Sequence, residues 1–425
     1  MTKNSPAVEG SIFRVQGPQT ITDVERELLD VEALRPLQLQ VPVYPGKWWF
    51  GGEAALIQLL ITWGRQRENA TLVTHIANDE DPAGQLKQLV KRPFGLVGTW
   101  MARDLTDRGR SRSLKVEANR ASEAIIDLMW RGRRDPRNVD QPSLWGDADD
   151  DRWEAPSLSA VGNRVFLASI DHHPRWRIPQ CYFPTGEVRY RDDFTSLAEA
   201  MARYATIATG GTPITADVRR TLGAILHELF KNTHEWARTD IHGAPLLRSV
   251  RGLLAQGHSW AEEEAKEAAK GSSALADYLA QPDVQSKDGR WRFLELSIFD
   301  SGIGLARRWL ASKRGGEIKL ADIQLDEEYA TVQECFLRWN SSTRDGHKGL
   351  GLHEVMETLS GLGAFFRVRT GRLSMYRDFL ASPYTDPGTA GSSLLADWSA
   401  HWDSLTAFAP VEGTLYTMLI PVTIR

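Results

Sequence analysis

Apolar and polar positions follow two spacings along the first half of the chain, and each spacing predicts a different element. Short apolar runs predict strands at residues 37–44, 70–77, 163–170 and 180–190. Apolar positions one helical turn apart predict helices at residues 51–69, 82–92, 119–132 and 196–210. Strands that alternate with helices at this spacing are typical of a small α/β domain.

The second half has a sharper pattern, and its longest amphipathic stretch covers residues 215–240. Thr215 is placed to cap this helix. Apolar residues recur along one face that we expect to be buried, namely Leu222, Ile225, Leu226 and Leu229. Further apolar runs predict strands at residues 292–300, 364–371 and 413–424, and the glycine-rich stretches 301–304 and 346–351 each precede another helix.

Composition narrows the class of protein. The 425 residues are 42% hydrophobic and 25% charged, and the formal net charge is −4. This balance is typical of a globular protein and does not indicate a nucleic-acid partner or a membrane surface. The two cysteines, Cys181 and Cys335, are far apart, so we expect neither a disulfide framework nor a zinc site. No signal-peptide pattern opens the sequence, and the longest apolar run is about half a bilayer span, so we expect a cytoplasmic protein.

The same pattern suggests how the chain is divided. We expect a flexible arm at residues 1–20, an α/β regulatory or interaction domain at 21–208 with a polar loop at 133–158, and a second domain at 209–425 with a helical insertion near 258–290. Gly210, Gly211 and Pro213 mark the boundary. The first domain resembles STAS-type regulatory domains, and a plain α/β sensor is the alternative. Asp171-His172-His173 resembles the DHH phosphoesterase motif but lacks its companion motifs, so we expect polar residues at a strand end.

One stretch of the long helix, LHELFKNTHEWA from Leu226 to Ala237, allows two interpretations. His227, followed by Glu-Leu and a basic residue, suggests the phospho-acceptor helix of a sensor kinase. Glu228 and Asn232 lie four residues apart and therefore project from one side of the helix. An amide oxygen can bind Mg²⁺, and a carboxylate one turn earlier can orient or deprotonate a water molecule, so this pair suggests an ATP site instead.

Two glycine motifs further along would suit such an ATP site. In Asp300-Ser-Gly-Ile-Gly304, a carboxylate at a strand end can accept a hydrogen bond while the glycines let the backbone approach a flat ligand. In the loop from Gly346 to Gly351, free backbone N–H groups and the following helix can bind phosphate oxygens, and Lys348 adds a positive charge. Taken singly, each motif has a structural alternative: a helix cap, a glycine turn, or a chance pair on a helix.

The order of these motifs resembles that of the GHKL, or Bergerat-fold, ATPase superfamily, which includes gyrase, heat-shock chaperones, histidine kinases and mismatch-repair ATPases. The resemblance covers residues 215–425. It implies an α+β fold in which a layer of helices packs on a mixed, mainly antiparallel sheet, preceded here by a separate small α/β domain.

The resemblance also implies roles for individual residues and a need for ATP and Mg²⁺. Asn232 would bind Mg²⁺, and Glu228 would be the general base. Asp300 would accept the adenine amino group, Gly302 and Gly304 would make room beside it, and Thr414 would contact the adenine through a water molecule. The phosphates would be held by Lys348, Gly349, Leu350 and Gly351. Residues 307–347 would form the lid over the triphosphate.

The resemblance favours the metal-binding interpretation of the long helix. The family requires an asparagine before the Asp300 motif, and none lies between Thr233 and Asp300. A phospho-acceptor helix usually has a proline five residues after its histidine, where this chain has Asn232. His227 is therefore expected to be a packing or surface residue. The chain departs from the known subgroups at Lys231 and Trp236. In gyrase-like members a second domain after the last strand carries a phosphate-sensing lysine, which here would have to come from elsewhere or be missing.

These observations lead to one expected function and two alternatives. We expect a Mg²⁺-dependent ATP-binding protein and slow ATPase whose nucleotide state changes how the N-terminal domain meets a protein partner or a second copy. One alternative is a kinase that transfers phosphate to a serine or histidine of a partner. The other is a nucleotide-sensing module with negligible turnover in a bacterial signalling or defence system.

Overall fold

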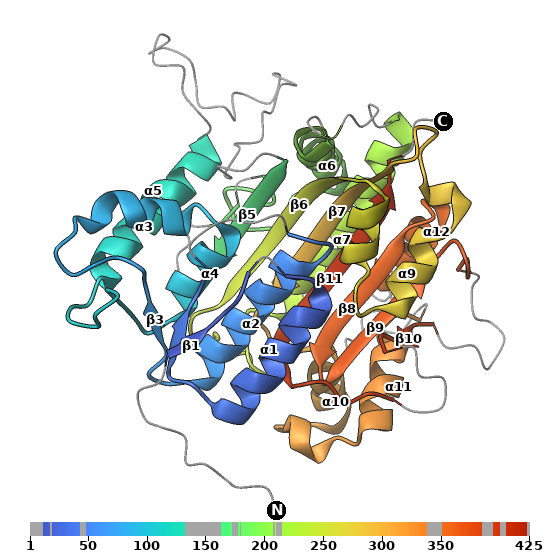
Figure 1. Cartoon of the computed structure of the whole chain (residues 1–425). Helices are drawn as coiled ribbons and strands as arrows, with labels where there is room; N and C mark the ends of the chain where they lie inside the picture. Colours follow the sequence, from blue (N-terminus) through green and yellow to red (C-terminus); the bar gives the residue numbers. More distant parts are fainter. Residues whose placement is uncertain are drawn as a thin grey trace, which may run out of the picture. The chain divides into compact units, whose positions relative to one another are not determined.

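The structure is a computed structural model and describes residues 12–17, 19–42, 48–131, 163–171, 177–178, 180–206, 209, 215–337, 351–384, 394–399 and 405–422. The chain forms two compact units, Met1–Ile125 and Ile126–Arg425. The first unit is α/β with a parallel sheet, and the second is α+β with an antiparallel sheet (Figure 1). The expected fold class is therefore confirmed.

The first unit is built on four short parallel strands in the order β1-β2-β3-β4. They are β1 (Ile12–Arg14), β2 (Gln38–Gln40), β3 (Thr71–Val73) and β4 (Asp104–Thr106). Parallel neighbours need crossover connections, which are helices here. The helices are α1 (Ile21–Leu34), α2 (Gly52–Gln66), α3 (Pro82–Val90) and α4 (Pro93–Met101), and α5 (Lys115–Arg131) follows β4. Helix α2 is the most apolar of the predicted helices and packs against α1 and α4.

The expected flexible arm at residues 1–20 is corrected where the structure describes it, because residues 12–14 form strand β1. Residues 12–14 pair with β2 and so form the edge of the parallel sheet. Helix α1, which the apolar pattern did not identify, begins with a capping box: Thr20 accepts a hydrogen bond from the Asp23 N–H, and the Asp23 carboxylate accepts one from the Thr20 N–H. This reciprocal pair is the sequence signal that would have located the helix.

Glu27 on α1 makes the stability of the protein depend on pH. Its Oε1 atom accepts hydrogen bonds from Gln16 N at 2.8 Å and Gln19 Nε2 at 2.6 Å. Burial nevertheless dominates and raises the pKa of the Glu27 carboxyl to about 7. A raised folded-state pKa means that the folded protein holds this proton more tightly than the unfolded chain, whose ordinary value is 4.5. The contribution of Glu27 to the stability of the folded protein is therefore complete below pH 4.5 and is lost as the pH rises through about 7.

We expect Glu27→Gln to remove this loss, because the amide keeps an accepting oxygen and carries no charge. Relative to the wild type, the variant should gain about 2 kcal/mol of stability at alkaline pH and little at acidic pH. Thermal unfolding of the full chain at about pH 5 and about pH 8 measures the difference. The same change at the exposed Glu117 is the control. A Glu27→Gln variant whose stability tracks the wild type at both pH values would contradict the prediction.

The second unit contains a seven-stranded antiparallel sheet in the order β10-β9-β8-β11-β7-β6-β5. Its strands are β5 (Arg164–Ile170), β6 (Val250–Trp260), β7 (Trp291–Asp300), β8 (Phe365–Gly371), β9 (Leu373–Asp378), β10 (Ala396–Asp397) and β11 (Val411–Pro421). Every pairing described in this sheet is antiparallel. Alternate residues of each long strand therefore point to the same face.

Helices cover one face of that sheet and form the main core with it. They are α6 (Arg191–Thr206), α7 (Ala216–Trp236), α10 (Leu305–Arg314), α11 (Leu325–Cys335) and α12 (Gly351–Gly361). The expected apolar face of α7 is confirmed: Leu222, Ile225, Leu226 and Leu229 are at most 1% exposed. They pack in one cluster with Leu253 and Ala255 of β6 and Leu296 and Ile298 of β7. The short helices α8 (Glu262–Ala268), α9 (Ser273–Leu279) and η3 (Pro282–Val284) connect β6 to β7, where the helical insertion was expected.

The expected domain boundary at residue 208/209 is wrong. Strand β5 pairs with β6 along seven residues, from Arg164↔Gln256 to Ile170↔Val250, so it belongs to the sheet of the second unit. Helix α6 packs against α7 and contributes Phe194, Leu197 and Met201 to the same core. The expected strand at 180–190 is also wrong: its described residues form a turn with an isolated bridge between Tyr182 and Val188. Local apolar spacing cannot reveal which sheet a strand joins, because that choice is made by contacts distant in sequence.

The expected lid at residues 307–347 is partly replaced by packed helices. Helices α10 and α11, with η4 (Leu320–Asp322) between them, occupy residues 305–335. Trp309, Val332 and Phe336 are buried, and Trp309 Nε1 donates to Glu334 Oε2 at 3.2 Å. The helices pack because their apolar residues recur at one-turn spacing. The rest of the expected lid, residues 338–347, lies outside the described residues.

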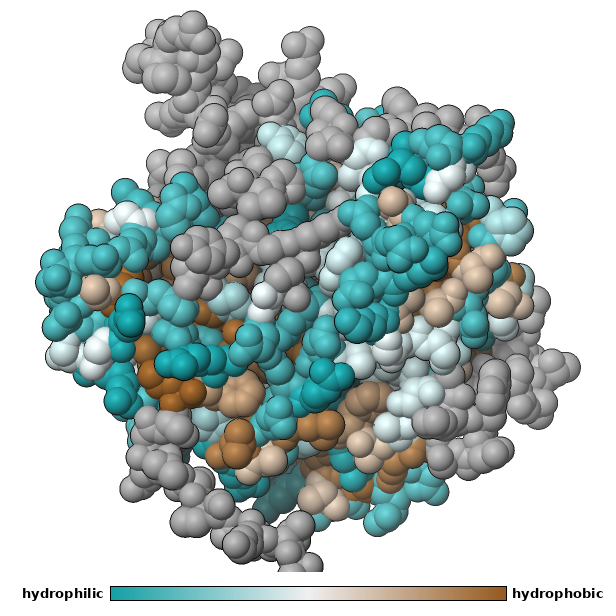
Figure 2. Space-filling view, viewed as in Figure 1, coloured by the Kyte–Doolittle hydropathy of each residue, from teal (hydrophilic) through white to brown (hydrophobic). Residues whose placement is uncertain are grey.

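One face of the molecule is mainly polar (Figure 2). On the face shown in Figure 2, hydrophilic residues predominate and hydrophobic residues form separate patches. The large apolar side chains exposed among the described residues are Leu29, Leu34, Leu37, Val116, Tyr190 and Leu247. Across the described parts of the chain, no helix is both long enough and apolar enough to cross a membrane.

Candidate functional site

Helix α7 positions the first group of candidate residues. The expected cap is confirmed, because the Thr215 side chain accepts a hydrogen bond from Val218 N at 3.3 Å. With its apolar face fixed in the core, the helix presents Glu228, Lys231 and Asn232 to a cavity. Residues four apart lie one turn above each other, so Glu228 and Asn232 share that side of the helix.

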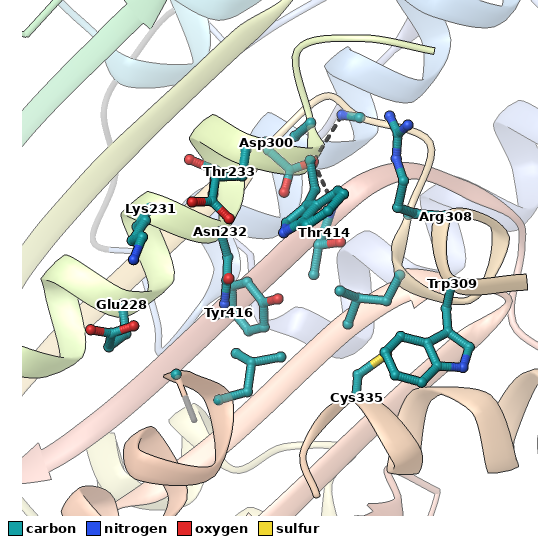
Figure 3. A pocket seen from close by; sticks show the side chains of 18 of the residues that line it. Glu228, Lys231, Asn232, Thr233, Asp300, Arg308, Trp309, Cys335, Thr414 and Tyr416 are labelled. Atoms are coloured by element: carbon teal, nitrogen blue, oxygen red, sulfur yellow. Dashed lines mark hydrogen bonds between the residues drawn. The ribbon is translucent and has the colours of Figure 1, made fainter. Parts of the chain in front are cut away.

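The cavity has a volume of about 460 Å³ and brings together every predicted site residue that the structure describes (Figure 3). These residues come from α7, the end of β7, the start of α12 and β11, and they are Glu228, Asn232, Asp300, Gly302, Gly304, Gly351 and Thr414. Lys348, Gly349 and Leu350 lie outside the described residues. Four chain segments that are distant in sequence therefore converge on one cavity.

Asp300 marks one end of the cavity. It is the last residue of β7 and is 5% exposed. Its Oδ1 atom accepts hydrogen bonds from the backbone N–H groups of Gly302 at 2.8 Å and Thr414 at 3.1 Å. Two donors on one carboxylate oxygen fix the orientation of the side chain. Figure 3 shows Asp300 and Thr414 side by side at this end, so the structure brings these two predicted residues together.

Glycines allow the chain segments around Asp300 to approach closely. Gly304, at the start of α10, has φ 85°, and a Cβ there would lie 2.9 Å from Thr370 Oγ1. At Gly302, a Cβ would lie 2.8 Å from the Cα and Cβ atoms of Ala237 at the end of α7. Both contacts are too short for a side chain, so the two glycines of the Asp300 motif hold β7 against α7 and β8.

Gly413, which precedes Thr414, makes a further close contact with Asp300. It lies at a bulge between Val411 and Thr414 in β11, has φ 73°, and donates its N–H to Gly302 O at 2.7 Å. A Cβ at this position would lie 1.9 Å from Asp300 O. The bulge places the Thr414 N–H on the Asp300 carboxylate. The Gly-Thr pair inside a largely apolar strand is the sequence signal of this bulge.

We expect Gly413→Ala to damage both the fold and the site, because the methyl group would displace the end of β7. The variant should lose about 2 to 4 kcal/mol of stability, measured by chemical unfolding. Gly243→Ala is the matched control, since Gly243 has φ 82° but no atom within 4 Å of the added Cβ. That control carries only the cost of the left-handed backbone, about 1 kcal/mol. Equal losses in the two variants would show that the contact with Asp300 is not tight.

Glu228 marks the opposite end of the cavity and is a carboxylate at neutral pH. Burial alone would raise its pKa, but the hydrogen bond from His227 and the electrostatic interactions with His227, Lys231 and Arg191 hold the pKa of the carboxyl below its ordinary value of 4.5. His227 Nδ1 lies 2.9 Å from Glu228 Oε1. The His227 ring also packs edge-on against Phe194 of α6, with ring centroids 5.3 Å apart. His227 therefore packs against α6 and positions Glu228, and its side chain is only 14% exposed.

Asn232 lies between the two ends of the cavity. Figure 3 shows its carboxamide directed from α7 towards Tyr416 on β11. Within the described part of the chain, this carboxamide makes no hydrogen bond, so its oxygen is available to a ligand. The described residues contain no group of three or more His, Cys, Asp or Glu side chains placed to hold a metal ion. A metal ion bound beside Asn232 would therefore need oxygens from a ligand.

The cavity wall also contains residues that were not predicted as site residues. Arg308 of α10 donates to the backbone oxygens of Thr239 and Asp240 and closes the Asp300 end. Apolar walls are supplied by Ile303, Leu305, Trp309, Leu352 and Tyr416. Cys335 also lines the cavity, and burial raises the pKa of its thiol to about 12, so the thiol stays protonated. Arg191 enters from α6, a helix that precedes every motif, and no sequence signal marked it.

A buried polar network supports α7 beneath the cavity. Arg251 of β6 is 1% exposed and forms an ion pair with Asp171, with Nη2 and Oδ1 2.5 Å apart. It also donates to Tyr182 at 2.7 Å and, at 3.3 Å, to the hydroxyl of Thr233, which lines the cavity. His234 forms a hydrogen bond with the Tyr182 hydroxyl. Burial and nearby arginines lower the pKa of His234 to about 3, so its ring is neutral. Asp171 is therefore engaged in structure, while His172 and His173 lie outside the described residues.

Comparisons of the chain with protein-family models, with curated proteins and with solved structures found no match. The function of the chain is therefore inferred from its motifs and from the geometry of this cavity.

Proposed function

We propose that the second unit binds ATP with Mg²⁺ in this cavity and hydrolyses it slowly. The observation that supports this proposal is the convergence of four separated motifs. A glutamate and an asparagine one turn apart, a strand-end aspartate with two glycines, the first turn of a glycine-preceded helix, and a strand threonine all line the same cavity. Its volume of about 460 Å³ lies within the range typical of small-molecule sites, about 300 to 1,000 Å³.

The Asp300 end is suited to the adenine. A buried carboxylate held by two backbone donors can accept a hydrogen bond from an exocyclic amino group without moving. The neighbouring wall is largely apolar, with Ile303, Trp309 and Tyr416 placed to contact a flat ring. A purine needs both features, because its faces are apolar and its edge is polar.

The Glu228 end is suited to the phosphates and the metal ion. Bound Mg²⁺ would neutralise phosphate charge and would take oxygen ligands. Asn232 offers a carboxamide oxygen, and Lys231 adds a positive charge. Gly351, the first residue of α12, brings a helix N-terminus to the cavity, where backbone N–H groups favour phosphate oxygens. Lys348, Gly349 and Leu350, which precede that helix, would extend the same phosphate contacts.

Hydrolysis is favoured over simple sensing by the state of Glu228. Its lowered pKa keeps it ionised at neutral pH, so it can accept a hydrogen bond from an attacking water molecule and then the proton. A carboxylate with a low pKa is a weak base, which is compatible with slow turnover. We further propose that the nucleotide state alters how the first unit meets a protein partner or a second copy of the chain.

The test is equilibrium binding of ATP to the purified full chain with Mg²⁺ and with a chelator, followed by phosphate release. The proposal expects Mg²⁺-dependent binding and slow release of inorganic phosphate. ATP binding without phosphate release would instead favour a sensing module, and label transfer from ATP to an added protein would favour a kinase. Failure to bind ATP under any of these conditions would overturn the proposal.

A further inference from the structure

Arg191 places a positive charge at the Glu228 end of the cavity from outside the predicted motifs. It is the first residue of α6, and the start of that helix is held by Asp193, whose carboxylate accepts from Tyr190 N at 3.1 Å and lies 3.5 Å from Arg189. The Arg191 side chain reaches across to two other helices. Helix α6 belongs to the same core as α7 and α12, so the fold fixes the position of the backbone from which Arg191 extends.

The guanidinium of Arg191 is shared between two carboxylates. Its Nη2 atom forms an ion pair with Glu354 Oε1 on α12 and lies 3.9 Å from Glu228 Oε1 on α7. Its Nε and Nη2 atoms are buried but make no hydrogen bond of good geometry within the described residues. The side chain as a whole is 41% exposed, so it retains room to move. Arg191 is thus held by charge without being fixed by hydrogen bonds.

The charges at this end of the cavity balance before any ligand enters. Among the described wall residues near Glu228, two carboxylates, Glu228 and Glu354, face two cations, Arg191 and Lys231. A phosphate group that enters there adds negative charge and competes with the carboxylates for Arg191. Arginine suits this exchange, because its planar guanidinium can bind phosphate oxygens in pairs.

We infer that Arg191 recognises the terminal phosphate of the nucleotide and so distinguishes a triphosphate from a diphosphate. This inference rests on the proposed ATP site and adds a specificity-determining residue to it. Arg191 lies beside Glu228, the residue proposed to activate water, and that water must lie next to the phosphorus atom it attacks. The part of the nucleotide nearest Arg191 is therefore the terminal phosphate. When it binds, Arg191 exchanges Glu354 for phosphate oxygens, and α12 loses its ion pair with α6.

The inference is tested by the affinities of Arg191→Met for a non-hydrolysable ATP analogue and for ADP, each with Mg²⁺. We expect the affinity for the ATP analogue to fall about tenfold, while the affinity for ADP changes by less than about twofold. Arg191→Lys should restore part of the difference, since it keeps a charge without the planar fork. The matched control is Arg219→Met, which removes an arginine that joins α7 to Glu199 of α6 away from the cavity wall.

Glu354→Gln gives the opposite readout. If Glu354 competes with the terminal phosphate for Arg191, this variant should bind the ATP analogue severalfold more tightly, and the change should vanish in the double variant with Arg191→Met. A purely structural role predicts instead that both single variants lower the affinities for ATP analogue and ADP together, and that result would overturn the inference while leaving the ATP site intact. A wild-type protein that binds neither nucleotide would overturn the proposed function itself, and the inference with it.

Discussion

Asp300→Asn is expected to abolish ATP binding by the purified protein. The carboxylate lies at the tip of β7 with one oxygen held by Gly302 N and Thr414 N, which fixes the plane in which it meets a ligand. An asparagine can keep an oxygen towards these two backbone donors, so the fold should survive. It then presents an NH₂ group to the adenine amino group, and two donors face each other. We expect the affinity for ATP to fall about 100-fold or more, because the adenine amino group would lose its acceptor and would face another donor inside the site.

The measurement is equilibrium titration with ATP and Mg²⁺, together with thermal unfolding to show that the variant is folded. Asp378→Asn is the control: Asp378 also ends a strand, β9, and also accepts from backbone N–H groups, at Leu380 and Ala381, but it does not line the cavity. Equal affinity in the wild type and Asp300→Asn would mean that the purine, if it binds, does not contact Asp300.

The second large effect is expected for Glu228→Ala, which should retain ATP binding and lose hydrolysis. Removal of a general base typically slows a reaction by about 10² to 10⁴, so phosphate release at saturating ATP should fall by about a hundredfold or more. Binding should change little, because Asn232, Asp300 and the helix N-terminus at Gly351 remain. The lowered pKa of Glu228 adds a further expectation: this group should impose no change of rate between about pH 6 and about pH 8, because it stays ionised throughout.

Glu235→Ala is the control for charge alone. Glu235 also lines the cavity and lies on the same helix, but two turns from Glu228. Its removal should leave phosphate release within about threefold of the wild type. If Glu228→Ala turned over ATP at the wild-type rate, Glu228 would not be the base, and its interaction with His227 and Arg191 would be purely structural.

The sequence pattern predicted the elements whose information is local. Helix α7 has a cap and an apolar stripe within its own residues. Strands β7 and β11 are rich in apolar residues, and β7 ends at the glycine turn that follows Asp300. The local sequence around Glu228, Asp300 and Thr414 does not predict that these residues lie close together. Only the resemblance to a known family predicted it. Their meeting in one cavity is what the structure adds.

The features that the sequence did not predict depend on contacts between distant segments. Strand β6 was missed because Gly252 and Gly257 interrupt its apolar pattern. A Cβ at Gly252 would lie 2.5 Å from Phe299 Cζ, and one at Gly257 would lie 1.8 Å from Ala205 O of α6. These glycines allow neighbours to approach, and so they are informative only once the neighbours are known. Arg191 was missed for the same reason, since its partners lie on α7 and α12, far along the chain.

The pairing of β5 with β6 has a consequence for any attempt to shorten or recombine this protein. A fragment cut at the glycine-rich break near residue 210 would keep every motif of the proposed ATP site. It would lose the outermost strand, β5, and expose the hydrogen-bonding edge of β6 along seven residues. It would also delete Asp171 and so remove the ion-pair partner of the buried Arg251. The smallest piece that can be moved between proteins as a working module therefore starts before Arg164, well ahead of the first recognisable motif.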